Sequence, residues 1–450
     1  MTGDAISHEG LKVEIGLPST VMLVIGGMVG VGVFVNPAVV ARSLHAPALM
    51  LAAWAAGGLI ALAGALVYGE LAARMPATGG EYVYLRETFG APAAFLFGWT
   101  LLLVVHTGGM AAVAIVFARN LDLLAGGRLP EGAAAVATLA GLAAINCLGV
   151  RSGNWTQSAL GVVKVAAIVA LVVAGFAVAG RAPPARAAAA PAAPDTLKAF
   201  GAAMIPVVFS YGGWQTTNFV AGEMRNPARN LARALAAGVL AVTGLYLAVN
   251  LACLAALGPA GLAATLTPAS EVLQRAVGPA GARLAAAAIG LSALAFLSQS
   301  TLTGPRVLFA MARDGLFFRA LASVSPATRV PALAIVVQAA WASVLALTGG
   351  YEQILSFVIA MNVLFFGLTA AGLFVLRRRE ARGGARHQGY RTPGHPWTTG
   401  LFVAACALIV ASSFWSYPVN SLIGYAILVL GIAPYLYFRR LRAAASAPPA

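Results

Sequence analysis

Apolar runs of about 20 residues follow one another along nearly the whole chain, and they constrain the fold more than any other feature. Each run is long enough to cross the hydrocarbon core of a bilayer as one α-helix. Of the 450 residues, 60% are hydrophobic and only 10% are charged, whereas soluble domains carry roughly 25% charged residues. We therefore expect an all-α integral membrane protein, because a spanning segment must satisfy its own backbone hydrogen bonds.

Twelve such runs are predicted to be transmembrane helices. They cover residues 16–41, 49–73, 92–119, 131–149, 155–179, 200–221, 233–257, 282–310, 330–349, 353–376, 398–416 and 420–438. A Pro/Ala-rich stretch after the fifth run marks the boundary between two halves of an internal duplication. The predicted organisation is an N-terminal tail 1–15, a five-helix repeat 16–180, an outer loop 181–199, a second five-helix repeat 200–376, a basic cytoplasmic loop 377–397, helices 11 and 12 over 398–438, and a tail 439–450.

The net charge of +15 is unevenly distributed between the two predicted sides of the membrane. With a cytoplasmic N-terminus, 20 of the 29 Lys and Arg residues lie on the cytoplasmic side, eight lie outside and Lys164 falls within a span. The positive-inside rule then predicts that both termini are cytoplasmic. We expect a multi-pass protein of a bacterial-type inner membrane, in contact with lipid and with no nucleic-acid partner.

Two glycine-rich stretches interrupt the predicted helices at mid-membrane. The first run contains four glycines between Gly26 and Gly32, and the sixth contains Gly212 and Gly213. A glycine costs about 1 kcal/mol relative to alanine inside a helix, so we expect both helices to be unwound there. Close helix packing is the alternative for a single stretch. Paired breaks at corresponding positions favour an inverted-repeat transporter with its substrate at the bilayer midplane.

The two breaks predict the chemistry of the substrate. A half-helix that begins after the first break directs free N–H groups and the positive end of its dipole toward an anion. Unwound carbonyl groups around both breaks suit an ammonium group. Together they describe a zwitterionic amino acid, and we expect it to be neutral because no Asp or Glu lies near either break.

Two ionisable residues lie deep within the predicted spans. Lys164 is about ten residues from the predicted cytoplasmic end of its helix, roughly 15 Å along the axis, so its ammonium group requires a carbonyl or carboxylate partner. His106 has two open interpretations, a functional site or a contact with a neighbouring carbonyl. Cys147, Cys253 and Cys406 all lie within spans, and we expect no disulfide, metal or cofactor.

Five motifs resemble those of the amino acid, polyamine and organocation (APC) superfamily, and within it those of the L-type amino acid transporters. They are residues 26–34, 68–82, 209–227, 306–317 and, more weakly, 390–397. The resemblance covers essentially the whole chain. It implies a LeuT-type fold of two inverted five-helix repeats, with helices 1 and 6 unwound at mid-membrane, plus two peripheral helices.

The resemblance also implies roles for single residues. The N–H groups of Gly30, Val31 and Gly32 would bind the substrate carboxylate, and the carbonyls of Met28, Phe209 and Gly212 its ammonium. Phe209 would be an aromatic gate, and Lys164 would replace a bound sodium ion. Gln215 and His106 are secondary candidates. The implied substrate-binding residues are Gly27, Met28, Val29, Gly30, Val31, Gly32, Phe209, Ser210, Tyr211, Gly212 and Trp214.

The chain departs from the family pattern at several places, which include Val31, His106-Thr107, Phe318 and the loop after the third helix. Many relatives carry Ser or Thr at the position of Val31, so carboxylate binding would depend here on the backbone alone. Animal members join a heavy chain through a disulfide after the third helix, but residues 120–130 contain no cysteine, so we expect no such partner.

We expect the protein to be a sodium-independent exchanger of neutral L-amino acids that works by alternating access, and not an enzyme. The alternatives are a proton-coupled amino acid symporter that uses Lys164, a cationic amino acid or polyamine transporter, and a non-transporting sensor.

Overall fold

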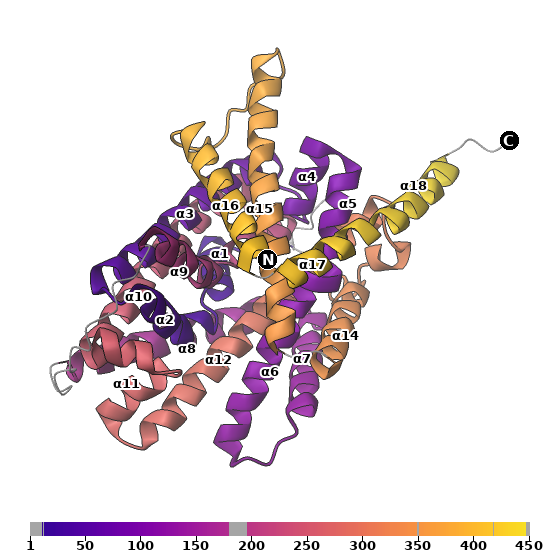
Figure 1. The fold of residues 1–450 in the computed structure, drawn as a ribbon. Coiled ribbons are helices and arrows are strands. Elements are labelled where there is room, and N and C mark those ends of the chain that lie inside the picture. The colour runs from indigo at the N-terminus through magenta and orange to yellow at the C-terminus, as the bar shows by residue number, and fades with distance from the viewer. Residues whose placement is uncertain (1–10, 12, 180–195, 349–350, 417, 447–450) are drawn as a thin grey trace.

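A computed structural model describes residues 11, 13–179, 196–348, 351–416 and 418–446 (Figure 1). Most of the predicted N-terminal tail 1–15 and outer loop 181–199 lies outside these residues, as do residues 447–450. The regular structure within the described ranges is helical, apart from one isolated parallel bridge between Ile15 and Met224. The prediction of an all-α protein is confirmed.

Eighteen α-helices, one π-helical turn (η1) and two 3₁₀ segments (η2, η3) form the described fold. In chain order they are α1 (Leu17–Met28), α2 (Gly32–Leu44), α3 (Pro47–Arg74), α4 (Glu81–Phe89), α5 (Ala91–Thr100), η1 (Leu101–Val105), α6 (His106–Ala125), α7 (Glu131–Cys147), α8 (Val150–Ala177), α9 (Thr196–Ser210), η2 (Trp214–Glu223), α10 (Pro227–Ala264), α11 (Pro268–Val277), α12 (Ala280–Thr303), α13 (Pro305–Arg313), η3 (Arg319–Ala322), α14 (Ala332–Thr348), α15 (Tyr351–Ala381), α16 (Trp397–Ser416), α17 (Pro418–Leu430) and α18 (Ile432–Ser446).

Eight helical segments within the described ranges are long and apolar enough to cross a membrane, or nine when the bent pair α1 and α2 counts as one span. The helices α7 and α14 are apolar but have only 17 residues each. Every predicted run overlaps a helix. The count of twelve crossings and the two inverted repeats stay predictions.

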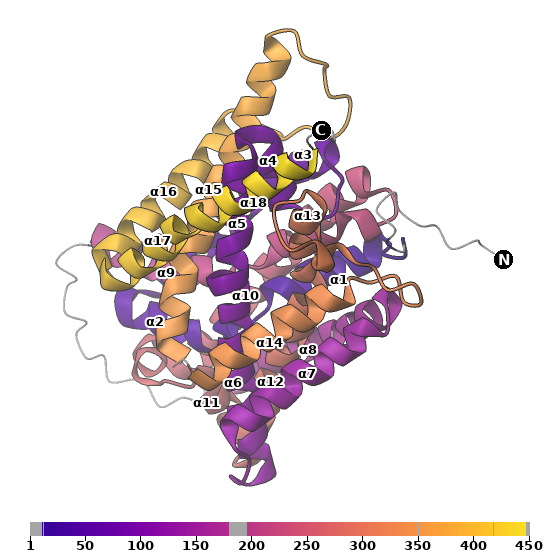
Figure 2. The ribbon, with the colours of Figure 1, turned by 90° about the vertical axis from the view of Figure 1, so that its right-hand side faces the viewer.

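The helices that carry the two breaks lie inside the bundle. Helix α10 packs along α3, α1 and α2, while α12 packs against α6 and α8. Half-helix α2 lies against α9, and α1 lies against η2, so each half of one broken span contacts a half of the other (Figure 1). Helices α17 and α18 lie across the outside of the bundle beside α5 (Figure 2).

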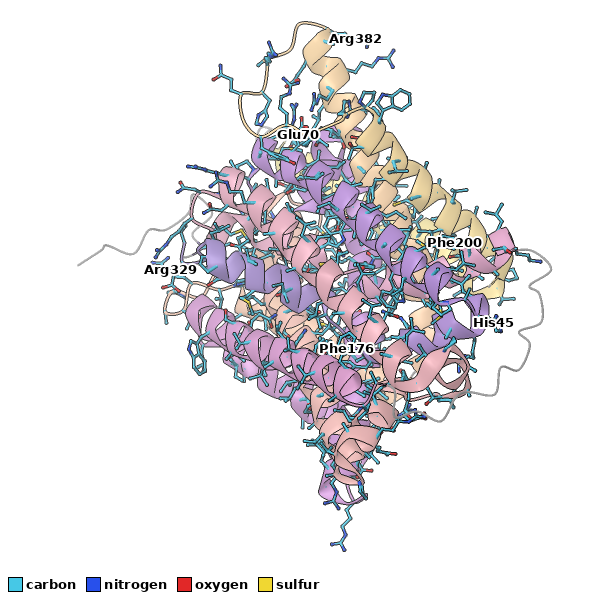
Figure 3. All side chains as sticks on the ribbon, turned by 90° about the vertical axis from the view of Figure 1, so that its left-hand side faces the viewer. His45, Glu70, Phe176, Phe200, Arg329 and Arg382 are labelled. Atoms are coloured by element: carbon cyan, nitrogen blue, oxygen red, sulfur yellow. The ribbon has the colours of Figure 1, made fainter. Side chains whose placement is uncertain are left out.

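A buried carboxylate anchors the end of α3 to the end of α15. The carboxylate of Glu70 is fully buried and accepts hydrogen bonds from Arg74, from Arg377 and from the N–H group of Thr392. Figure 3 shows Glu70 and Arg382 at the same end of the molecule. The basic segment that follows α15 is therefore held against the bundle by ion pairs with a desolvated carboxylate.

The two ends of the motif at residues 68–82 are joined by a hydrogen bond, and the motif packs against η2. The Tyr68 hydroxyl donates to Glu81 Oε1 at 2.6 Å, and Glu81 is 1% exposed. The Gly79 N–H donates to the carbonyl of Phe219 at 2.9 Å, and a Cβ on Gly80, whose φ is +48°, would lie 2.8 Å from the Asn218 backbone. Burial raises the pKa of Glu81 from 4.5 to about 8, although the Tyr68 hydrogen bond opposes the shift.

Replacing Glu81 by Gln should remove a pH dependence of stability. Between pH 5 and 8 the unfolded carboxyl is deprotonated while the folded one keeps its proton, so wild-type stability should fall as pH rises. The Glu81→Gln variant keeps an acceptor for Tyr68 and should lose less stability over this window. The measurement is the thermal unfolding midpoint in detergent from pH 5 to 8.5. Glu87→Gln, at an exposed carboxylate of α4, should keep the wild-type slope, and parallel curves for all three proteins would contradict the assignment.

Candidate functional site

The first break separates α1 from α2. Helix α1 ends at Met28, α2 begins at Gly32, and the two axes differ in direction by 44°. Met28 and Val29 are buried, whereas Gly30, Val31 and Gly32 are partly exposed. The predicted interruption therefore exists, and it exposes backbone inside the bundle.

The start of α2 presents unused hydrogen-bond donors. Among the described residues, the N–H groups of Val31 and Gly32 donate to no protein acceptor, while the N–H group of Gly30 faces the Tyr246 hydroxyl. Helix α2 has 13 residues, and its dipole places partial positive charge at this end. Free N–H groups at a helix N-terminus form a site that suits an anion such as a carboxylate.

The second break lies between α9 and η2. Helix α9 ends at Ser210, and Gly213 has a φ of +101°, in the left-handed region. The Gly213 N–H donates to Gln215 Oε1 at 3.0 Å, and the Thr216 hydroxyl donates to the Gly213 carbonyl at 2.8 Å. Gln215 thus stabilises the unwound turn, and the Gly212 N–H donates to the Phe209 carbonyl at 3.1 Å.

The two breaks cross at Gly27 and Gly213 with their backbones in direct contact. A Cβ on Gly213 would lie 2.1 Å from the Gly27 carbonyl oxygen, and a Cβ on Gly27 would lie 2.6 Å from the Gly213 carbonyl oxygen. No side chain fits at either position without movement of the backbone. The glycine stretches therefore fit both interpretations given above, helix unwinding and close helix packing, because they allow the breaks and bring the two broken spans together.

A tyrosine that sequence reasoning missed links the ends of the two half-helices. The Tyr246 hydroxyl, on α10, shares its hydrogen between the carbonyls of Met28 at 2.9 Å and Ser210 at 3.0 Å. Its buried ring lies against Trp54 and Tyr211, with centroid distances of 5.5 and 5.1 Å. The Met28 carbonyl, predicted to bind ammonium, thus already accepts one hydrogen bond and has one lone pair left.

Lys164 binds the carbonyl end of α1. It is 1% exposed, and its Nζ donates to the carbonyls of Gly26, at 2.9 Å, and Val29. A cation at the C-terminal end of a helix interacts favourably with the helix dipole. The Ser292 hydroxyl on α12, also missed from the sequence, lies 3.3 Å from the carbonyls of Val29 and Gly30. Helices α8 and α12 therefore meet at the Val29 carbonyl.

Trp214 packs into an aromatic cluster beside the second break. Its ring contacts Tyr68 edge-on at 4.8 Å and lies 5.9 Å from Phe366 and 6.2 Å from Phe402. Trp214 and Gly212 line an apolar cavity of about 20 Å³, close to the volume of one water probe.

The remaining predicted residues have defined surroundings. The Tyr211 hydroxyl donates to the Trp54 carbonyl at 3.0 Å, and Phe209 is partly buried. His106 Nε2 lies 3.0 Å from the Ser300 carbonyl on α12. The sequence left two interpretations of His106 open, and this is the contact with a neighbouring carbonyl that one of them proposed. Within the described residues, no group of three or more His, Cys, Asp or Glu side chains could hold a metal ion.

Alanine at either crossing glycine should destabilise the fold. Gly27→Ala and Gly213→Ala each force a methyl group into backbone, and Gly213→Ala also places a side chain at a positive φ, so each should cost about 1–3 kcal/mol or more. Gly244→Ala on α10 is the matched control, because a Cβ there meets no atom within 4 Å. Thermal unfolding in detergent should show lower midpoints for the first two variants alone. A wild-type midpoint for Gly213→Ala would contradict the crossing.

Comparisons with known proteins identify the family of this chain. The family model for amino acid permeases matches residues 15–436. The serine/threonine exchanger SteT of Bacillus subtilis is 30% identical over 446 residues, 97% of this chain and 99% of its own. The human large neutral amino acids transporter small subunit 2 is 28% identical over 94% of this chain and 80% of its own. The human b(0,+)-type amino acid transporter 1 is 26% identical over 82% and 76%. The chain therefore belongs to the amino acid permease family, as a multi-pass membrane transporter and not an enzyme.

Proposed function

We propose that this protein exchanges neutral L-amino acids across a bacterial-type inner membrane, without sodium and by alternating access. The observation that carries the proposal is the row of N–H groups at the start of α2, of which those of Val31 and Gly32 are unused among the described residues, next to the carbonyl ends of α1 and α9. An α-amino acid has one carboxylate and one ammonium group on the same carbon. The N–H row suits the carboxylate, and the carbonyls suit the ammonium.

A neutral side chain is favoured by the absence of a nearby countercharge. Among the described residues, no carboxylate makes a hydrogen bond or ion pair with a residue between Gly27 and Gly32 or between Phe209 and Gly213. The buried carboxylate of Glu223 is paired with Arg306 at 2.7 and 3.0 Å. The names of two relatives, the serine/threonine exchanger and the large neutral amino acids transporter subunit, fit such a substrate.

Sodium independence is supported by the position of Lys164. Its ammonium group lies on the carbonyls of Gly26 and Val29, so a positive charge is already present where the first broken span needs one. The same residue supports the alternative of proton symport, because this buried ammonium has carbonyl partners and no carboxylate among its described contacts. A cationic or polyamine substrate is the less favoured alternative, since the breaks offer it no carboxylate.

We place both termini in the cytoplasm, on the basis of the charge distribution. No disulfide-linked heavy chain is part of the proposal, because residues 120–130, which include the loop after α6, contain no cysteine.

Counterflow in proteoliposomes tests the proposed function. Vesicles loaded in turn with each of the twenty amino acids should accumulate labelled L-serine or L-leucine when the internal amino acid is small or medium and neutral, to the same extent with and without sodium. Accumulation into empty vesicles under a pH gradient would identify proton symport instead. Uptake of arginine or polyamines but not of alanine, serine or leucine would contradict the neutral substrate.

Removing the Lys164 charge should impair exchange. Lys164→Met leaves the carbonyls of Gly26 and Val29 without their cation, so the exchange rate should fall at least about tenfold, which corresponds to roughly 1.4 kcal/mol. Lys198→Met, the same substitution at an exposed lysine of α9, should exchange at the wild-type rate. Full activity of Lys164→Met, or a sodium requirement in the wild type, would contradict the role given to Lys164.

A further inference from the structure

An asparagine on α2 links the first broken span to the second. Asn36 lies one helical turn after Gly32, and its Nδ2 donates to the Pro206 carbonyl at 3.0 Å and to Ser210 Oγ at 2.7 Å, both on α9. The Ser210 hydroxyl donates in turn to the Pro206 carbonyl at 2.8 Å. Three polar groups thus form a closed ring of hydrogen bonds between the two half-helices.

The two donor groups of this ring, the Asn36 amide and the Ser210 hydroxyl, both make hydrogen bonds within it. The Asn36 amide nitrogen donates to two acceptors, and the Ser210 hydroxyl accepts one bond while it donates another. Hydrogen bonds that share a group in this way polarise and strengthen one another in a low-dielectric interior. Ser210 is 4% exposed, so the ring is a specific link and not a solvated surface contact.

The ring lies directly against the N–H row at the start of α2. A Cβ on Gly32 would lie 2.8 Å from Ser210 Oγ and 3.1 Å from Asn36 Nδ2. The Ser210 carbonyl, at the end of α9, also accepts a bond from the Tyr246 hydroxyl. The side chain of Ser210 therefore contacts the donor end of one half-helix while its carbonyl belongs to the acceptor end of the other.

We propose that Asn36 is a positioning residue for substrate binding. Its amide fixes the spacing between the N–H groups at the start of α2 and the carbonyl end of α9, and this spacing must match the distance between the carboxylate and the ammonium of one amino acid. Asn36 acts through Gly32 and Ser210 and need not contact the substrate itself. The inference rests on the proposed function, because it assumes that these two helix ends bind an amino acid.

The expected signature is a loss of affinity with little loss of stability. Asn36→Ala removes both bonds to α9, so the half-saturating concentration of substrate should rise about tenfold while the maximal rate stays within about twofold of wild type. Ser210→Ala removes the Ser210 hydroxyl with its two bonds, but it leaves the Asn36 bond to the Pro206 carbonyl that joins α2 to α9, so its effect should be smaller. Asn36→Asp has the same shape but no N–H donor, and it adds a negative charge beside the carboxylate site, so its effect should be the largest.

The experiment is exchange of labelled L-serine and L-leucine in proteoliposomes over a range of external concentrations, with thermal unfolding of each variant in detergent. Asn120→Ala is the matched control, because the bond that the Asn120 amide makes among the described residues is to the Val116 carbonyl of its own helix, at 2.8 Å. It should leave the half-saturating concentration unchanged. The order wild type, Ser210→Ala, Asn36→Ala, Asn36→Asp in rising half-saturation would support the proposal.

Two results would overturn the inference. One is an unchanged half-saturating concentration in Asn36→Ala. The other is a fall of maximal rate and unfolding midpoint at constant half-saturation, which would mark a purely structural role. If the wild-type protein itself exchanged no amino acid, the proposed function would fail instead, and this outcome is recognised before any variant is compared.

Discussion

Every feature of the central region follows from one constraint, which is that backbone groups freed at a helix break must find partners inside an apolar bundle. The two breaks meet where Gly27 and Gly213 bring their backbones together. The freed carbonyls of α1 and α9 are bound by Lys164 and by the hydroxyls of Ser292 and Tyr246. The N–H groups of Val31 and Gly32 at the start of α2 have no protein partner among the described residues, so this end of the helix lacks an acceptor, which the carboxylate of the proposed substrate would supply.

The freed carbonyl groups have protein partners, whereas free N–H groups stay at the start of α2 in the described part of the chain. This difference explains how a binding site can be built almost entirely from backbone groups. Carbonyl groups are held by residues from α8, α10 and α12, which fixes their direction before any ligand arrives. The donor end is fixed by the Asn36 amide and by the packing of Gly32 against Ser210. Preorganisation of this kind lowers the cost of binding a small ligand.

The sequence predicted the breaks and the need of Lys164 for a partner, but not the other residues that hold the breaks. Glycine clusters inside apolar runs are a strong local signal, since a helix interior disfavours glycine, and an isolated deep lysine such as Lys164 demands a partner. Tyr246, Ser292 and Asn36 carry no such signal, because a single tyrosine, serine or asparagine in an apolar run is common and its direction depends on the rotation of its helix. The motif at 68–82 contributes to the family resemblance, but the packing of its Gly79 and Gly80 on η2 could not be predicted from spacing alone. His106 left two interpretations open, because either one needs only a nearby polar atom.

The central claim is that the start of α2 binds the carboxylate of an amino acid through backbone N–H groups. The most direct measurement is an experimental structure of the purified protein with L-serine or L-leucine bound, at a resolution that places the ligand carboxylate. The account predicts carboxylate oxygens within about 3 Å of the nitrogens of Gly30, Val31 and Gly32, with the ammonium directed at the carbonyl ends of α1 and α9. A ligand bound elsewhere, for example in the apolar cavity beside Trp214, or with its carboxylate directed away from α2, would contradict it.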